Sequence, residues 1–162
     1  MAGVGICYFR RVAVVLTLVD VHPPRLGDQM RSIGLIGLGA SGLDMARSLR
    51  RAGYAMYVYD VRIDAARTFA AGGGVACASV AEVAARCEVV VSTVANGAQN
   101  EQILFGAAGI AGTMKPGGLF IMCSTVDPTL SKSWEERLSA LGILYLEAPA
   151  SQEAAKAIAR RA

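Results

Sequence analysis

Two patterns of apolar and polar positions alternate along most of the chain. Short apolar runs are typical of buried strands, whereas apolar residues three or four positions apart are typical of one face of a helix. The runs predict strands at residues 33–36, 56–60, 75–77, 88–94, 119–123 and 143–146. The wider spacing predicts helices at residues 41–52, 63–71, 80–86, 98–105 and 128–141. Strands that alternate with helices predict an α/β fold, with a mostly parallel sheet and helices on both of its faces.

Glycine, proline and capping residues mark the ends of these elements. Gly53 and Gly142 each stand at the end of a predicted helix, where glycine closes the last turn without strain. Ser79 and Glu82 have the spacing of a capping box, which predicts that a helix begins there. The Pro-Gly-Gly sequence at residues 116–118 predicts a turn.

Composition places the chain among ordinary globular domains. Its 162 residues are 54% hydrophobic and 18% charged, which excludes a disordered protein and suits a single domain with a substantial core. The net charge of +3 is small and the arginines form no stripe, so we expect no nucleic-acid partner. No apolar run approaches the ~20 residues of a transmembrane helix, so we expect no membrane span.

Residues 1–30 do not fit the alternation of strands and helices. Arg10 and Arg11 precede the apolar residues 12–19, as in a short secretory signal, but no small-residue cleavage site follows. A proline pair and a glycine then interrupt the segment. We expect residues 1–30 to be an extension outside the core and the protein to be cytoplasmic; an N-terminal targeting segment is the alternative.

The four cysteines and the single histidine do not form a metal-binding pattern. No two cysteines have the Cys-x-x-Cys spacing of a zinc site and His22 stands alone, so we expect no metal. Cys87 and Cys123 lie in or beside apolar runs, which predicts buried thiols in a reducing compartment.

A glycine-rich loop joins the first predicted strand to the first predicted helix. In a Gly-x-Gly-x-x-Gly turn, the first glycine makes the tight bend, the second lets a pyrophosphate approach the backbone, and the third lets the helix pack closely on the sheet. The helix N-terminus adds N–H groups and partial positive charge for the phosphates. The sequence therefore predicts a Rossmann domain that binds NAD or NADP, and a glycine turn without a ligand is the alternative. The loop residues are Gly37, Leu38, Gly39, Ala40, Ser41 and Gly42.

Asp60 supplies the second part of the dinucleotide pattern. It ends the second predicted strand about twenty residues after the loop, where a carboxylate accepts hydrogen bonds from the adenosine ribose. A carboxylate repels a 2′-phosphate and so favours NAD. Arg62, two residues further on, could bind that phosphate instead, so NADP stays possible. Asp60 could also act only as a cap for the end of the strand.

Further blocks of sequence resemble one family. They are residues 52–54 (Ala-Gly-Tyr), 58–60 (Val-Tyr-Asp), 104–106 (Leu-Phe-Gly), 115–117 (Lys-Pro-Gly), 124–128 (Ser-Thr-Val-Asp-Pro) and 148–151 (Ala-Pro-Ala-Ser). In this order they resemble the β-hydroxyacid dehydrogenases, such as 3-hydroxyisobutyrate dehydrogenase and tartronate semialdehyde reductase, and the NAD(P)-binding domain of 6-phosphogluconate dehydrogenase. The resemblance covers residues 31–151, is nearest to the threonate and hydroxy-oxopropionate members, and leaves residues 152–162 as a divergent tail.

The resemblance implies roles for further residues. Val94, Ala95 and Asn96 stand where the family has a loop beside the adenosine half of the cofactor, with Ala95 in place of a proline. Thr125 matches the residue at the nicotinamide end, although a hydroxyl in this position also stabilises turns. Ser151 matches the serine that binds the substrate.

The resemblance also implies an activity, which is NAD(P)-dependent hydride transfer to or from a small hydroxy acid. In the family, a C-terminal helical domain supplies the catalytic lysine. Here Gln152 and Glu153 replace two glycines, that helical domain is missing from the sequence, and neither Lys132 nor Lys156 matches the lysine, so we expect no catalytic residue. The alternatives are an oxidoreductase, a non-catalytic dinucleotide-binding module or truncated product, and an interaction protein that forms a homo-oligomer through its last strand.

Overall fold

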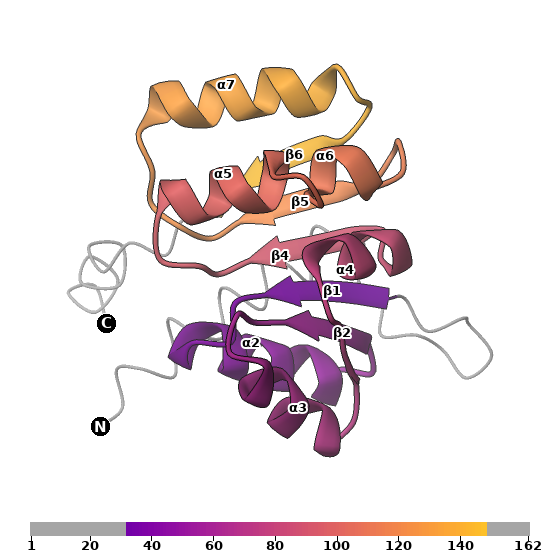
Figure 1. Ribbon diagram of the computed structural model, residues 1–162. Helices are drawn as coiled ribbons and strands as arrows, with labels where there is room; N and C mark the ends of the chain where they lie inside the picture. The colour runs from indigo at the N-terminus through magenta and orange to yellow at the C-terminus, as the bar shows by residue number, and fades with distance from the viewer. Residues whose placement is uncertain (1–31, 149–162) are drawn as a thin grey trace, which may run out of the picture.

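Six parallel strands form one sheet at the centre of the molecule (Figure 1). The structure, a computed structural model, describes residues 32–148. The strand order is β3-β2-β1-β4-β5-β6, and every neighbouring pair is parallel. The predicted α/β class is therefore confirmed, with the order of a Rossmann fold and its reversal point between β1 and β4. The strands are β1 (Ser32–Ile36), β2 (Ala55–Tyr59), β3 (Val75–Ala76), β4 (Val89–Ser92), β5 (Leu119–Met122) and β6 (Leu144–Glu147).

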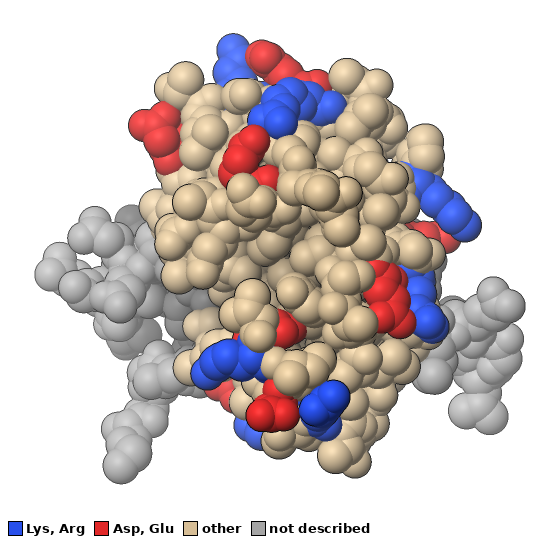
Figure 2. All heavy atoms as spheres, viewed as in Figure 1, with Lys and Arg blue, Asp and Glu red and all other residues tan. Residues whose placement is uncertain are grey.

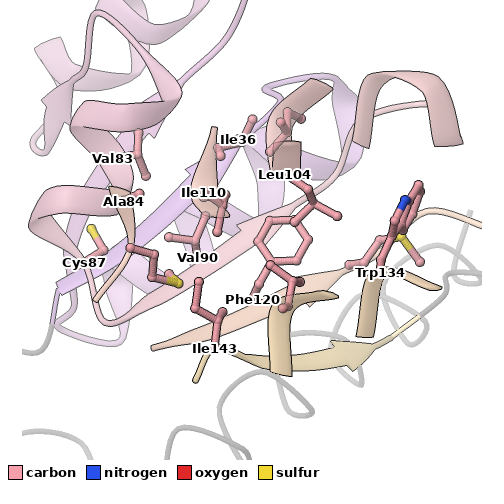
Figure 3. Close-up of a cluster of buried hydrophobic side chains, with 14 of the residues drawn as sticks. Ile36, Val83, Ala84, Cys87, Val90, Leu104, Ile110, Phe120, Trp134 and Ile143 are labelled. Carbon is pink, nitrogen blue, oxygen red and sulfur yellow. The ribbon is translucent and has the colours of Figure 1, made fainter. Parts of the chain in front are cut away.

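Helices cover both faces of this sheet. The helices are α2 (Ala40–Arg51), α3 (Ile63–Ala71), α4 (Val80–Arg86), α5 (Gly97–Phe105), α6 (Ile110–Thr113) and α7 (Pro128–Ser139). Helices α2 and α3 pack on one face, around a core that includes Leu35 and Phe69. Helices α4 to α7 pack on the other face, around a core that includes Phe120 and Trp134 (Figure 3). Successive strand residues point to opposite faces, so the continuous apolar runs contribute to both cores.

Polar side chains fix the beginnings of two helices beside the site described below. The Ser79 hydroxyl accepts a hydrogen bond of 3.1 Å from the Glu82 backbone N–H, as the capping box predicts. The Glu82 carboxylate accepts from the Ala78 N–H rather than from that of Ser79 itself. The Asn96 side chain caps α5 by accepting from the Gln99 N–H at 3.0 Å. These caps satisfy N–H groups that no helical carbonyl reaches.

Several elements end at positions other than those predicted. Strand β4 ends at Ser92, two residues early. The Thr93 N–H still donates to the Ile36 carbonyl at 2.9 Å, and its hydroxyl donates to the Gly37 carbonyl at 2.6 Å, where the glycine loop begins. Helix α7 ends at Ser139, also two residues early, and Gly142 closes the turn in a left-handed conformation with φ of 72°. The prediction missed α6, because its four residues are too few to show an apolar period.

The cysteines of the described chain are buried thiols that form no disulfide within residues 32–148. Cys77, Cys87 and Cys123 all lie in the core, which confirms the burial predicted for the last two. Burial raises the pKa of Cys77 to about 11 and that of Cys87 to about 12. Both thiols are therefore neutral at ordinary pH and pack as small hydrophobic groups.

The surface shows mixed charge, and β6 lies at one of the two edges of the described sheet. Figure 2 shows acidic and basic side chains interspersed over the visible face. Strand β6 has one neighbour in the described sheet, and Leu144 on it is 61% exposed, so association through this strand stays a prediction. Within residues 32–148, no helix is long and apolar enough to cross a membrane. The predicted N-terminal extension and C-terminal tail lie outside the described residues.

Candidate functional site: a dinucleotide pocket

The glycine loop is held tightly between β2 and β4. Gly37 has a φ of 95°, a left-handed conformation that strains any residue with a side chain. Its N–H donates to the Tyr59 carbonyl at 2.9 Å, and its carbonyl accepts from the Thr93 hydroxyl at 2.6 Å. The loop is therefore fixed to the carboxyl ends of both neighbouring strands before any ligand binds.

The other two glycines of the loop have different surroundings. A Cβ built on Gly42 would lie 1.9 Å from the Gly37 carbonyl oxygen and 2.4 Å from the Thr93 hydroxyl oxygen. A Cβ built on Gly39 would meet no heavy atom within 4 Å. The absence of a side chain at Gly42 is thus needed for packing of the chain itself. At Gly39 it leaves space open in front of the backbone, and Gly39 lines the pocket.

The N-terminus of α2 opens at this space. Gly39 is the N-cap residue of α2, and the helix has no side-chain cap and no acidic residue in its first turn. Ala40 and Ser41 form the exposed beginning of that turn. A helix end of this kind carries a partial positive charge and suits a phosphate group.

Asp60 links the loop to the end of β2. It lies one residue beyond the strand and is 7% exposed. Its Oδ2 accepts from the Leu38 N–H at 2.6 Å, and its Oδ1 accepts from the Arg62 N–H at 2.8 Å. Burial raises the pKa of the Asp60 carboxyl, but these two backbone N–H groups and the charge of Arg62 outweigh that effect and hold the pKa below its usual range. The carboxylate therefore stays charged at neutral pH.

Asp60 therefore caps the end of the strand, and its carboxylate can still accept one more hydrogen bond. A carboxylate offers about four lone-pair sites, and Oδ2 uses one of its two on Leu38. The Leu38 side chain is itself buried in the core. The Arg62 side chain is 67% exposed, and its Nε forms a long ion pair of 3.4 Å with Oδ1.

A pocket of about 860 Å³ opens over the carboxyl ends of β1, β2 and β4. Its walls come from the glycine loop, the segment after β2, the beginning of α4, the segment after β4, and one side of α5 with the turn that follows it. Its charged lining residues are Asp60 and Arg62, and neither Lys115 nor Lys132 lines it. The described residues contain no group of three or more His, Cys, Asp or Glu side chains that could hold a metal ion.

The structure brings most of the predicted site residues together. Val94, Ala95 and Asn96 line the pocket, and Val94 lies beside Gly37 of the glycine loop. The Ala95 N–H donates to the Gln99 side-chain oxygen at 2.9 Å, which orders the segment that lacks the family's proline. Thr125 is exposed beyond β5 and is not among the lining residues, and Ser151 lies outside the described residues.

Some lining residues were not expected from the sequence. Tyr59, Val61, Gln99 and Gln102 all contribute to the pocket walls. The positions of Gln99 and Gln102 on successive turns of a helix were visible in the sequence. The sequence did not show which face of α5 turns toward the pocket, because that depends on how α5 packs on β4.

Comparison with known proteins agrees with this geometry. The family model for the NAD-binding domain of 6-phosphogluconate dehydrogenase matches residues 32–161. The chain belongs to this family. An NAD-binding domain of the 6-phosphogluconate dehydrogenase type explains the glycine loop, the acidic residue after β2 and the strand order in one assignment.

Similar proteins are longer than this chain. The L-threonate dehydrogenase of Cupriavidus necator is 47% identical over 127 residues, which are 78% of this chain and 43% of that protein. The mitochondrial 3-hydroxyisobutyrate dehydrogenase of Mus musculus is 34% identical over 119 residues, which are 74% of this chain and 36% of that protein. A crystal structure of 3-hydroxyisobutyrate dehydrogenase from Salmonella typhimurium is 34% identical with a TM-score of 0.67, covering 71% of this chain and 40% of that one. The chain spans less than half the length of these relatives.

Proposed function

We propose that the domain binds NAD(H) with the pyrophosphate over Gly39 and the adenosine ribose at Asp60. The observation that carries this proposal is the open space at Gly39, which is the N-cap residue of α2 and lines the pocket. The Asp60 carboxylate lies at the adjacent strand end and keeps a free lone pair on Oδ2 for a ribose hydroxyl.

The charge of Asp60 favours NAD over NADP. Burial raises the pKa of the Asp60 carboxyl, but two backbone N–H groups and Arg62 hold the pKa below its usual range, so the site carries a negative charge at neutral pH. A 2′-phosphate on the same ribose would stand against this fixed negative charge. Arg62 offers only partial compensation, because its guanidinium already faces Asp60.

Replacing Asp60 by alanine is expected to shift the preference toward NADPH. The affinity for NADH should fall about tenfold, because a ribose hydroxyl loses a charged acceptor. The affinity for NADPH should hold or rise, because the repulsion is gone and Arg62 is released. Fluorescence titration with both reduced cofactors measures the ratio of the two dissociation constants.

Asp64 provides the matched control for this experiment. It is a carboxylate four residues away, 92% exposed, and outside the pocket lining. Asp64→Ala should leave both affinities as they are in the parent. If the ratio of the NADH and NADPH dissociation constants is the same in Asp60→Ala as in the parent, Asp60 does not determine the preference between the two cofactors.

We further infer that the domain serves an oxidoreductase acting on a small hydroxy acid. The family relatives named for L-threonate and 3-hydroxyisobutyrate support this substrate class. The bound nicotinamide would supply the hydride acceptor or donor. The described pocket contains no lysine to exchange a proton with the substrate hydroxyl, so we propose that residues 32–148 bind the cofactor without turning over substrate.

Activity measurements test this second part. The purified chain is incubated with NAD and either L-threonate or 3-hydroxyisobutyrate, and formation of NADH is followed by absorbance. We expect no turnover above background from a protein that binds NADH in titration. Turnover that is lost in Gly39→Val would overturn the binding-module proposal and show a complete enzyme.

A further inference from the structure

Three buried polar side chains form a network behind the pocket wall. Ser92 and Asn100 are fully buried, and Ser124 is 6% exposed. Ser92 is the last residue of β4, Asn100 lies in the middle of α5, and Ser124 is the second residue after β5. None of the three lines the pocket.

Hydrogen bonds connect these side chains to the loop that does line the pocket. The Asn100 side-chain oxygen accepts from the Ser92 hydroxyl at 2.7 Å. The Asn100 side-chain nitrogen donates to the Asn96 carbonyl at 3.1 Å and to the Ser124 hydroxyl oxygen at 3.0 Å. The Ser124 hydroxyl donates its proton to the Val94 carbonyl at 2.5 Å.

The network requires an amide at position 100 in one orientation. The Asn96 carbonyl accepts hydrogen bonds but cannot donate them, so the atom that faces it must be the amide nitrogen. Ser124 uses its only proton on the Val94 carbonyl and therefore needs a donor from Asn100. A carboxylate or an alkyl group at this position would leave the buried Ser124 hydroxyl oxygen without its donor, although the Asn96 carbonyl would keep the Asn100 backbone N–H at 3.2 Å.

The network joins the loops that follow β4 and β5. Residues 94–96 of the first loop form part of the pocket wall, and Ser124 lies in the second loop, two residues after β5. In a doubly wound sheet a dinucleotide spans the crevice at the point where the strand order reverses, here between β1 and β4. Its adenosine half then lies over the β1-β2 side, and its second half lies toward β4 and β5.

We propose that Asn100 is a positioning residue that holds the loops after β4 and β5 in a fixed position relative to each other. The two halves of the dinucleotide would then bind against loops whose relative position is already set. This rests on the proposed NAD(H) site. Asn100 acts through the Asn96 and Val94 carbonyls and touches no ligand atom. A side chain outside the pocket therefore controls affinity inside it.

The test uses three variants and two probes. Ser124→Ala removes one hydroxyl, Asn100→Leu removes the amide at similar volume, and the third variant combines both. NADH probes the whole site, and ADP-ribose probes it without the nicotinamide ring. Thr113→Val is the matched control, because it deletes a hydroxyl that donates to the Gly109 carbonyl at 2.8 Å, and neither Thr113 nor Gly109 lines the pocket.

Ser124→Ala is expected to weaken both NADH and ADP-ribose by about three- to tenfold, although Ser124 contacts neither probe. The double variant should bind within about twofold of Asn100→Leu alone, because both changes break one network. Thr113→Val should lower only the melting temperature.

A purely structural role gives a different result. It would lower the melting temperature of Ser124→Ala and leave both dissociation constants unchanged at a temperature where the protein is folded, and that result would overturn the proposal. Additive losses in the double variant would also overturn it. If Asn100→Leu does not fold, the Ser124→Ala affinities still decide. Failure of the proposed NAD(H) site would show separately, as no binding of NADH to the parent chain.

Discussion

Replacing Gly39 by valine is expected to reduce NADH affinity by about a hundredfold or more, with the fold intact. The new side chain would enter space that no atom of the protein occupies within 4 Å, which is the space we assign to the pyrophosphate. Gly39 has a φ of −62°, which any residue adopts, so the backbone needs no change. The cost in stability is that of a poorer N-cap, about 1 kcal/mol or less. Titration with NADH and thermal unfolding measure the two effects separately.

Gly112 is the matched control for this substitution. A Cβ there also meets no heavy atom within 4 Å, but the residue lies in α6 and does not line the pocket. Gly112→Val should bind NADH like the parent. If Gly39→Val keeps the parent affinity, the phosphate position assigned here is wrong.

Replacing Gly42 by alanine is expected to destabilise the domain by about 3 kcal/mol, because the added methyl group has no room. Its Cβ would stand 1.9 Å from the Gly37 carbonyl oxygen, a backbone atom that strand contacts hold in place. For a domain of this size the melting temperature should fall by roughly 6–12 °C. The loss would come despite the better helix propensity of alanine, which alone would stabilise α2 by about 1 kcal/mol.

Gly39→Ala is the comparison that isolates the cause. Both substitutions add one methyl group within the same loop, but only that at Gly42 meets backbone. Gly39→Ala should melt close to the parent. A Gly42→Ala protein with the parent melting temperature would mean that the helix and the loop are not packed as described.

These two glycines show how far the sequence alone could lead. The spacing of Gly37, Gly39 and Gly42, followed by Asp60 after the next strand, predicted the loop, the Rossmann fold and the nucleotide class, because backbone sterics leave few residues for such a turn. The strand and helix pattern was correct for the long elements. Their ends shifted by up to two residues where side chains such as Thr93 took backbone partners from distant segments.

The polar network around Asn100 could not be predicted in this way. An asparagine at the centre of a helix is usually a solvent-exposed residue, and nothing in its local sequence indicates that Ser92 and Ser124 lie within hydrogen-bond distance. Ser124 is 24 residues away along the chain. Such contacts arise only when β4, β5 and α5 pack together, so they belong to the tertiary structure rather than to any motif.

The same limit applies to Asp60. The sequence placed the carboxylate at the strand end, but its bonds to the Leu38 and Arg62 N–H groups follow from how the loop folds back over β2. Those bonds hold it charged and leave one acceptor site open. The proposed preference for NAD over NADP therefore rests on bonds that only the structure reveals, whereas the sequence supplied only the candidate residue.

The most direct test of the central claim is calorimetric titration of the parent chain with NADH. The account predicts saturable binding at one site per chain, competed by ADP-ribose, because the pyrophosphate and adenosine subsites are both formed by the described residues. An absence of saturable binding by a protein that unfolds cooperatively would contradict this claim, since the glycine loop would then be folded but would not bind the cofactor.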